Sequence, residues 1–237
     1  MLHVLSLSGI PIRLHWSFSL LILAMLAMGG YQFGWPGVLA GGIAGVGLSV
    51  SVVLHELGHA LAARRFGIET AHITLYPFGG IAAIERMPEE PDQEIVIALA
   101  GPAVNFVLAA VAGWIWLLTD QPASLIFVAS NVLMGLFNLI PAFPMDGGRV
   151  LRAVLAKSMG FIPASRLAVR IGRGFAWVFI VLALPLRSFN LALVGVFLHV
   201  ALNSEKERLV AMNWERTTGR PPPWEEQPQA FPGVVVR

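Results

Sequence analysis

The chain has 237 residues, of which 56% are hydrophobic and only 13% are charged. Soluble domains carry roughly 25% charged residues, so this composition excludes an ordinary soluble protein and indicates an integral membrane protein. The sequence contains no cysteine, which leaves His, Asp and Glu as the side chains able to hold a metal. The formal net charge is +2 and the arginines do not form one block, so we expect no nucleic-acid partner.

Two apolar segments follow a short N-terminal stretch. Residues 14–33 are long enough to cross about 30 Å of hydrocarbon as a helix. A secretory signal peptide is the alternative for this segment, because Ala27-Met28-Gly29 resembles a small-residue cleavage site. The second segment, residues 36–66, is rich in glycine, and Gly41 and Gly45 have the spacing that lets two helices approach closely. We expect both segments to span a membrane.

The second apolar segment carries the motif His55-Glu56-Leu57-Gly58-His59 near its end. On a helix the two histidines lie one turn apart on the same face, where they can hold one zinc ion. Glu56 is then close enough to contact a water at that zinc. A charge at the centre of a membrane span costs about 2.5–3.5 kcal/mol on insertion scales, so such groups usually serve a function. The alternative is a metal-free, hydrogen-bonded group between helices.

The segment after the motif does not have the pattern of a helix. Residues 72–76 include β-branched side chains in alternation, and Pro77-Phe78-Gly79-Gly80 interrupts the pattern before a second short apolar run at 81–84. This pattern predicts a short hairpin or re-entrant loop over about residues 70–86. Irregular backbone at membrane depth lines a cavity or packs in protein, and a strand edge there could pair with an extended peptide. A surface hairpin on the lipid headgroups is the alternative.

Further apolar segments predict spans at about residues 94–118, 123–140, 167–186 and 191–202. The first of these contains Gly101-Pro102-Ala103-Val104-Asn105, and Asn105 needs a polar partner in hydrocarbon. Asn105 therefore either lines the site or bonds to another helix. Residues 149–173 are basic and amphipathic, as in a connector on an anionic leaflet, and residues 206–237 are expected to form a disordered, cytoplasmic tail.

A zinc ion held by two histidines needs a third protein ligand and an open position. The span 123–140 is followed by Pro141, Pro144 and Asp146-Gly147-Gly148, where prolines stop the helix and a flexible turn follows. Asp146 is the best candidate for the third ligand. Glu85 is the rival, but it lies beside Arg86 in an acidic loop. Asp146 could instead cap a turn or a helix.

Charge predicts which side of the membrane the site faces. With six spans and both termini on one side, the turns near residues 32–36, 120–122 and 186–190 face the other side. Of 16 Lys and Arg residues only Arg187 falls in those turns, so the positive-inside rule places both termini in the cytoplasm. The histidines and Asp146 then lie toward the cytoplasmic side. We expect a multi-pass membrane protein, in the inner or plasma membrane if the organism is prokaryotic.

These motifs together resemble those of the site-2 protease family of intramembrane zinc metalloproteases. The resemblance rests on the histidine motif, on Pro77-Phe78-Gly79-Gly80, on Gly101-Pro102-x-x-Asn105, and most of all on Asn138-x-x-Pro141-x-x-Pro144-x-Asp146-Gly147-Gly148. It covers nearly all of residues 10–205. It implies one all-α polytopic domain over residues 1–205, with about six transmembrane helices and a short re-entrant hairpin after the second.

The resemblance implies that His55, His59 and Asp146 bind one zinc ion and that Glu56 is the catalytic base. It also implies that Asn138 contacts the substrate and that the loop around Gly79 and Gly80 presents an edge to it. We add Asn105 as a candidate substrate-binding residue.

The implied reaction is hydrolysis of a peptide bond within or near a transmembrane segment of a membrane-protein substrate, in regulated intramembrane proteolysis. Some relatives insert a PDZ domain or append a CBS pair, and we expect neither in this chain. A regulatory membrane partner or a homodimer is left open.

Two other classes of protein are alternatives. A membrane metal-ion transporter also places His and Asp within spans, but usually has several ionisable groups along a pathway. Here the ionisable groups cluster at one depth, which favours a single site. A catalytically inactive membrane scaffold of the same fold would usually have lost a motif residue, and none is lost.

Overall fold

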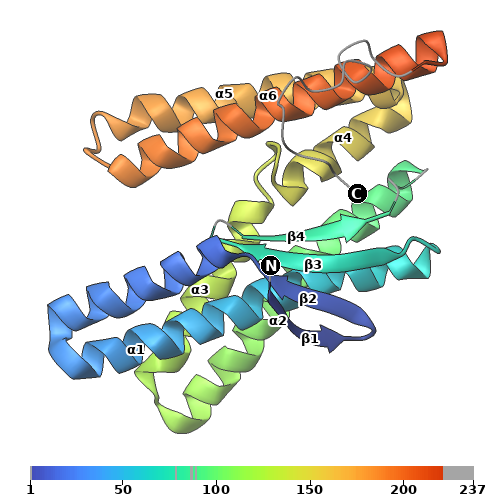
Figure 1. The fold of residues 1–237 in the computed structure, drawn as a ribbon. Coiled ribbons are helices and arrows are strands. Elements are labelled where there is room, and N and C mark those ends of the chain that lie inside the picture. Colours follow the sequence, from blue (N-terminus) through green and yellow to red (C-terminus); the bar gives the residue numbers. More distant parts are fainter. Residues whose placement is uncertain (1, 78, 86–87, 89, 221–237) are drawn as a thin grey trace, which may run out of the picture.

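The computed structural model describes residues 2–77, 79–85, 88 and 90–220 (Figure 1). The elements in chain order are β1 (Leu2–Leu7), β2 (Ile10–Leu14), α1 (Trp16–Arg65), β3 (Thr70–Tyr76), β4 (Gly79–Ile84), α2 (Pro91–Thr119), α3 (Pro122–Asn138), α4 (Asp146–Met159), α5 (Phe161–Ala183) and α6 (Phe189–Thr218). The fold is therefore mostly helical, with a small sheet at one end of the helices.

Helix α1 folds back on itself at Gly34, which has a φ of 64° and a ψ of −147° (Figure 1). Only glycine adopts this conformation readily, and Pro36 follows it. The two arms lie so close that a Cβ atom on Gly41 would be 2.6 Å from the Met25 carbonyl oxygen. The two spans predicted at 14–33 and 36–66 correspond to these arms, and the second arm returns the chain to the sheet.

The sheet has four strands in the order β1-β2-β3-β4. The hairpin predicted after α1 is present as the antiparallel pair β3–β4, but β2 also pairs with β3 in parallel. The expected all-α class is therefore corrected: the N-terminal hairpin β1–β2 was not predicted. In β2, Ile10 and Ile12 alternate into the core, where they pack with Phe18, Ile73 and Leu75. This pairing becomes possible because the hairpin of α1 brings β2 and β3 side by side.

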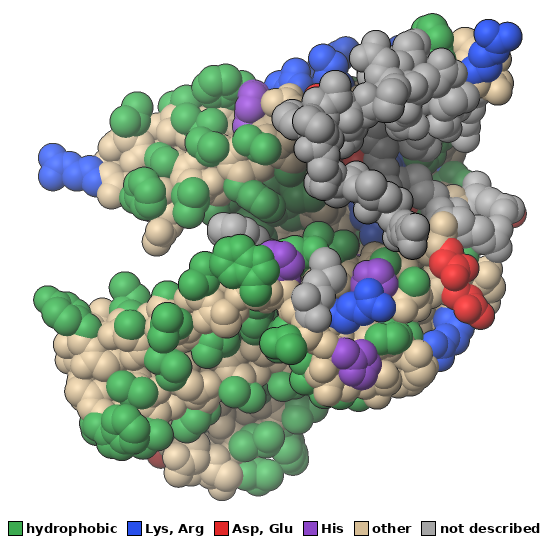
Figure 2. Space-filling view, viewed as in Figure 1, with side chains coloured by type: hydrophobic (Ala, Val, Ile, Leu, Met, Phe, Trp, Pro, Cys, Tyr) green, Lys and Arg blue, Asp and Glu red, His purple; other side chains and the backbone are tan. Residues whose placement is uncertain are grey.

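The exposed surface of the helices is strongly apolar. Helices α1 and α2 are each long and apolar enough to cross a membrane, and α3 is a shorter apolar helix. In α5, Arg166, Arg170 and Arg173 interrupt the apolar stretch, so the number of spans stays a prediction. Charged side chains gather mostly toward the right of Figure 2, and hydrophobic side chains cover its left. Large exposed apolar residues include Tyr31, Phe33, Trp35, Leu118, Leu184 and Phe189.

Helices α5 and α6 form a layer that α4 connects to the rest of the molecule (Figure 1). The layer packs around buried Phe143, Ala168, Leu198 and Leu202. The basic connector predicted at 149–173 consists of α4 and the first part of α5, which meet at Gly160. Helix α6 continues to Thr218, so the start of the tail expected to be disordered is helical. Its continuation is stabilised by Leu209, which is buried in the same core. Residues 221–237 lie outside the described part.

Candidate metal centre

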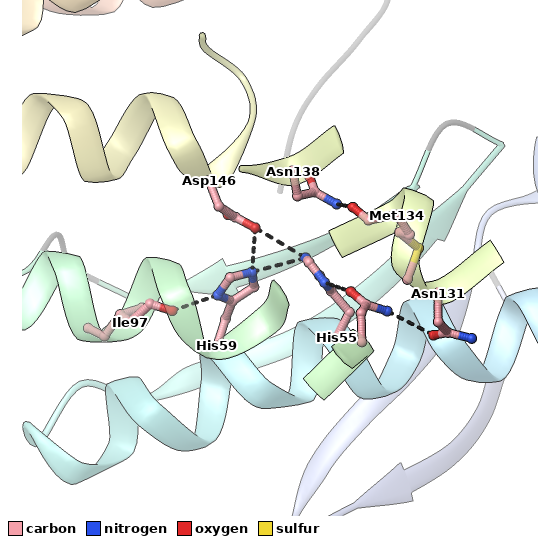
Figure 3. A network of polar contacts seen from close by, with 8 residues as sticks. His55, His59, Ile97, Asn131, Met134, Asn138 and Asp146 are labelled. Carbon is pink, nitrogen blue, oxygen red and sulfur yellow. Dashed lines mark hydrogen bonds and ion pairs between the residues drawn. The ribbon is translucent and has the colours of Figure 1, made fainter. Parts of the chain in front are cut away.

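Three potential metal ligands converge where α1 meets the start of α4. His59 Nε2 lies 3.1 Å from His55 Nε2 and 3.1 Å from Asp146 Oδ2, and His55 Nε2 lies 3.2 Å from the same oxygen (Figure 3). All three residues are buried. Two imidazole nitrogens this close repel one another unless a proton or a cation lies between them, and the carboxylate adds a negative charge. The cluster has the donor types of a zinc site with three protein ligands.

The Nδ1 atom of each histidine, which faces away from the cluster, is hydrogen-bonded to an oxygen, and this bond determines the tautomer of the ring. His59 Nδ1 lies 2.7 Å from the Ile97 carbonyl oxygen, and His55 Nδ1 lies 2.6 Å from Asn105 Oδ1 (Figure 3). A carbonyl oxygen only accepts, so each Nδ1 carries the proton. Each neutral imidazole then directs an unprotonated Nε2 into the cluster. Such outer partners orient metal-binding histidines and raise their basicity.

Glycines allow α2 to lie directly against the two histidines. A Cβ atom on Gly101 would overlap His59 Nε2 and lie 2.8 Å from His55 Cε1. Gly58, between the two histidines, lies equally close to α2, because its Cβ atom would be 2.9 Å from the Ala100 carbonyl oxygen. No larger residue fits at Gly101 without moving the imidazoles.

Asp146 is positioned by the loop that follows α3. The two residues after it, Gly147 and Gly148, lie against the backbone of that loop: a Cβ atom on Gly148 would be 2.6 Å from the Phe143 nitrogen. The first turn of α4 therefore packs tightly onto the loop, which sets the direction in which the Asp146 carboxylate points.

The ion pairs of Arg152 hold α4 in place. Arg152 is 1% exposed, and its guanidinium pairs with Glu94 of α2 and, at 3.2 Å, with Glu205 of α6. The guanidinium also lies over the rings of Phe143 and Phe161, with centroid distances of 5.1 and 4.9 Å. The helix that supplies Asp146 is thus connected to both neighbouring layers.

Glu56 lies beside the cluster and lines the same cavity. It is half-buried, and among the described residues its carboxylate forms no hydrogen bond and no ion pair. The backbone of Gly80 packs against it, so that a Cβ atom at position 80 would be 3.1 Å from Glu56 Oε1. The carboxylate is therefore held in one place and remains available to a water molecule or a substrate.

The cluster and Glu56 line a cavity of about 970 Å³. Figure 2 shows the molecule hollowed between the layer of α5 and α6 and the layer that contains α1, and residues of both layers line the cavity. The other lining residues include Phe18, Gly79, Gly80, Asn138, Arg149 and Phe197. The cavity is wide enough for an extended segment of polypeptide.

The structure brings most of the predicted site residues together. His55, Glu56, His59, Asn138 and Asp146 share the cavity with Gly79 and Gly80. Glu85, the rival third ligand, lies on the cavity wall but is exposed and outside the ligand cluster.

Asn105 does not join the other predicted site residues on the cavity wall. It is fully buried behind His55 and is not among the residues that line the cavity, which favours the alternative of a helix-to-helix hydrogen bond. Its Nδ2 donates to Asn131 Oδ1 on α3 at 3.0 Å. Asn131 was missed, although an Asn within an apolar span needs a partner for the same reason as Asn105.

Comparison with known proteins agrees with this geometry. Residues 43–124 and 119–181 match peptidase family M50. A zinc metalloprotease of Methanocaldococcus jannaschii is 36% identical over 220 residues, which cover 88% of this chain and 61% of the relative. The stage IV sporulation protein FB of Bacillus subtilis is 32% identical over 169 residues, covering 67% of this chain and 57% of the relative.

The solved structure of a site-2 protease from Methanocaldococcus jannaschii superposes with a TM-score of 0.66 at 34% identity. The match covers 86% of this chain and 94% of that one. The chain spans about three fifths of the length of the curated relatives that it matches. From the matched segments and these relatives, the chain belongs to peptidase family M50.

Proposed function

We propose that the chain is a zinc metalloprotease that hydrolyses a peptide bond within or near a membrane-spanning segment of a protein substrate. The observation that carries the proposal is the convergence of His55, His59 and Asp146 beside Glu56, in a cavity among apolar helices. The names of the relatives, zinc metalloprotease and site-2 protease, support the same activity.

His55, His59 and Asp146 would hold the zinc ion. Their three donor atoms face one another, and the two histidines present unprotonated nitrogens because their other nitrogens donate outward. A zinc ion held there would supply Lewis-acid chemistry, which activates a water as the nucleophile and polarises the scissile carbonyl.

Glu56 would act as the general base and then as the general acid. It follows His55 directly on α1, so its carboxylate reaches the same cavity without being a member of the ligand cluster. As base it takes a proton from the attacking water, and as acid it passes that proton to the leaving amine. Because its carboxylate forms no hydrogen bond or ion pair with the described residues, Glu56 is available for this transfer.

The substrate would bind as an extended strand, because a helix hides its carbonyl groups in i→i−4 hydrogen bonds. Strand β4 is at the edge of the sheet, and Gly79, Gly80 and Ala82 line the cavity. A peptide added to this edge would run past Glu56, in the cavity that Asn138 also lines. The multi-pass topology with cytoplasmic termini, proposed from the charge distribution, would put the cleaved bond near the cytoplasmic side.

A metal-transport role has less support. Among the described residues, His55, His59 and Asp146 are the one group of three or more His, Asp or Glu side chains positioned for a metal. Transport would require further ionisable groups along a pathway.

The test is proteolysis by purified protein in detergent, with fluorescein-labelled casein and with a single-span membrane protein as probes. Wild type should cleave, and Glu56→Gln should lose at least about 100-fold of the rate, as expected when the general base is removed. Glu85→Gln is the matched control, because this exposed glutamate lines the same cavity. Turnover retained by Glu56→Gln would refute the role of Glu56.

A further inference from the structure

We propose that Asn131 is a positioning residue for the metal centre: through Asn105 it fixes the proton of His55 on Nδ1 and so directs the bare Nε2 toward the metal. That a metal binds at this centre rests on the proposed function. The hydrogen bonds that connect Asn131, Asn105 and His55 are formed by the protein without a metal.

A backbone carbonyl sets the direction of the chain. Asn131 Nδ2 lies 3.0 Å from the Phe127 carbonyl oxygen, which can only accept, so this end of the Asn131 amide is the donor. Asn131 Oδ1 therefore faces the other way and accepts from Asn105 Nδ2 at 3.0 Å. Asn105 Oδ1 then accepts from His55 Nδ1–H at 2.6 Å (Figure 3).

The orientation of the Asn105 amide decides whether His55 can bind a metal. An amide flipped by 180° has almost the same shape but would present its NH₂ group to His55 Nδ1. Nδ1 would then have to accept, and the proton would move to Nε2, which lies 3.2 Å from Asp146 Oδ2. A protonated Nε2 cannot ligate zinc. Without Asn131, only the bond to His55 would oppose the flip.

Because both amides are buried, hydrogen bonds to protein groups set their orientation. Asn105 is 0% exposed and Asn131 is 1% exposed, so solvent does not reach either amide. A buried amide that loses its partner has no water to replace it, and it reorients to recover a hydrogen bond.

The two histidines are held in different ways. His59 Nδ1 donates directly to the Ile97 backbone carbonyl, whereas His55 depends on side chains from α2 and α3. A change at position 131 should therefore affect His55 and leave His59 unchanged. A merely structural contact between α2 and α3 would not produce this asymmetry.

The experiment compares wild type with Asn131→Leu, Asn131→Asp and Ser130→Ala. Leucine has a similar size but no polar group, and aspartate keeps an oxygen that accepts from Asn105. The neighbouring Ser130 is the control: its hydroxyl donates one turn back to the Ile126 carbonyl at 2.8 Å, as Asn131 does to Phe127. Two quantities are measured in detergent: the zinc Kd by chelator competition, and the ¹⁵N spectrum of labelled histidines in metal-free protein.

Asn131→Leu should raise the zinc Kd by about tenfold, the lower end of the range for outer partners of metal ligands. In the metal-free variant the His55 signals should gain the Nε2–H form, while those of His59 stay in the Nδ1–H form. Asn131→Asp should keep the Nδ1–H form at His55, and Ser130→Ala should match wild type in both measurements.

Wild-type zinc affinity in Asn131→Leu, with His55 unchanged in the spectrum, would overturn the inference and leave Asn131 as a helix contact. If Asn131→Leu does not fold, Asn131→Ala is measured against the same two outcomes. Failure of wild type to bind zinc would refute the proposed function. The role of Asn131 in setting the His55 tautomer would still be decided by the histidine spectra, which are recorded on metal-free protein.

Discussion

Replacing Gly101 with alanine should dismantle the metal centre. A Cβ atom at this position would overlap His59 Nε2 and lie 2.8 Å from His55 Cε1. Non-bonded carbon atoms need about 3.5 Å, so the His55 ring would have to move by roughly 0.7 Å and the His59 ring by more. Metal–ligand distances depart from their preferred values by only about 0.2 Å. Neither imidazole could therefore keep its place.

The assay is the zinc Kd of purified Gly101→Ala. We expect a rise of at least about 100-fold, because two ligands move at once and the loss of one outer partner already costs 10–100-fold. Gly113→Ala is the matched control on the same helix: its Cβ atom would meet only Val128 Cγ2, at 3.9 Å, so its zinc Kd should equal that of wild type. A wild-type Kd in Gly101→Ala would refute the described packing of α2 against the histidines.

Three further predictions test other parts of the site. Gly80→Ala should lower the rate of casein cleavage at least about tenfold while the zinc content stays the same, because the new methyl group displaces the Glu56 carboxylate but no metal ligand. Arg152→Met should destabilise the protein by about 3–5 kcal/mol in thermal unfolding, because it leaves Glu94 buried and unpaired. Lys157→Met, which breaks an exposed ion pair, should cost less than about 1 kcal/mol, and an equal loss in both variants would contradict this reasoning. A chelator should abolish cleavage and added zinc should restore it; cleavage that persists without metal would exclude a metalloprotease.

The ligands on α1 could be predicted from the sequence because their spacing is local. His55 and His59 are one helical turn apart in any helix, so the motif needs no tertiary information. Asp146 is 87 residues from His59, and it was found because the prolines before it end a span on the side where the histidines lie. Charge distribution thus supplied the long-range information that the motif lacks.

The partners of the buried amides could not be predicted. The sequence indicates that Asn105 needs a hydrogen bond, but whether it lines the cavity or bonds to another helix depends on how α2 packs against its neighbours. That packing is set by contacts such as the ring of Phe106 against Gly135, which no periodicity reveals. The hydrogen bond between Asn131 and Asn105, and with it the orientation of His55, depends on how α1, α2 and α3 pack together.

The N-terminal hairpin was missed for a similar reason. Most of β1 is exposed, so its residues carry no alternation of buried and exposed positions. In strand β2, Ile10 and Ile12 are buried in a core that includes Ile73 and Leu75 of β3, about sixty residues later in the chain. Strand formation there depends on tertiary context more than on intrinsic propensity.

The assignment of three zinc ligands and a separate general base is tested most directly by the zinc content of purified wild type, Glu56→Gln, His59→Ala and Asp146→Ala. We expect about one zinc per chain in wild type and in Glu56→Gln, and loss of zinc in the other two variants, because three residues hold the metal and Glu56 is reserved for proton transfer. Zinc retained by Asp146→Ala, or lost from Glu56→Gln, would contradict that assignment.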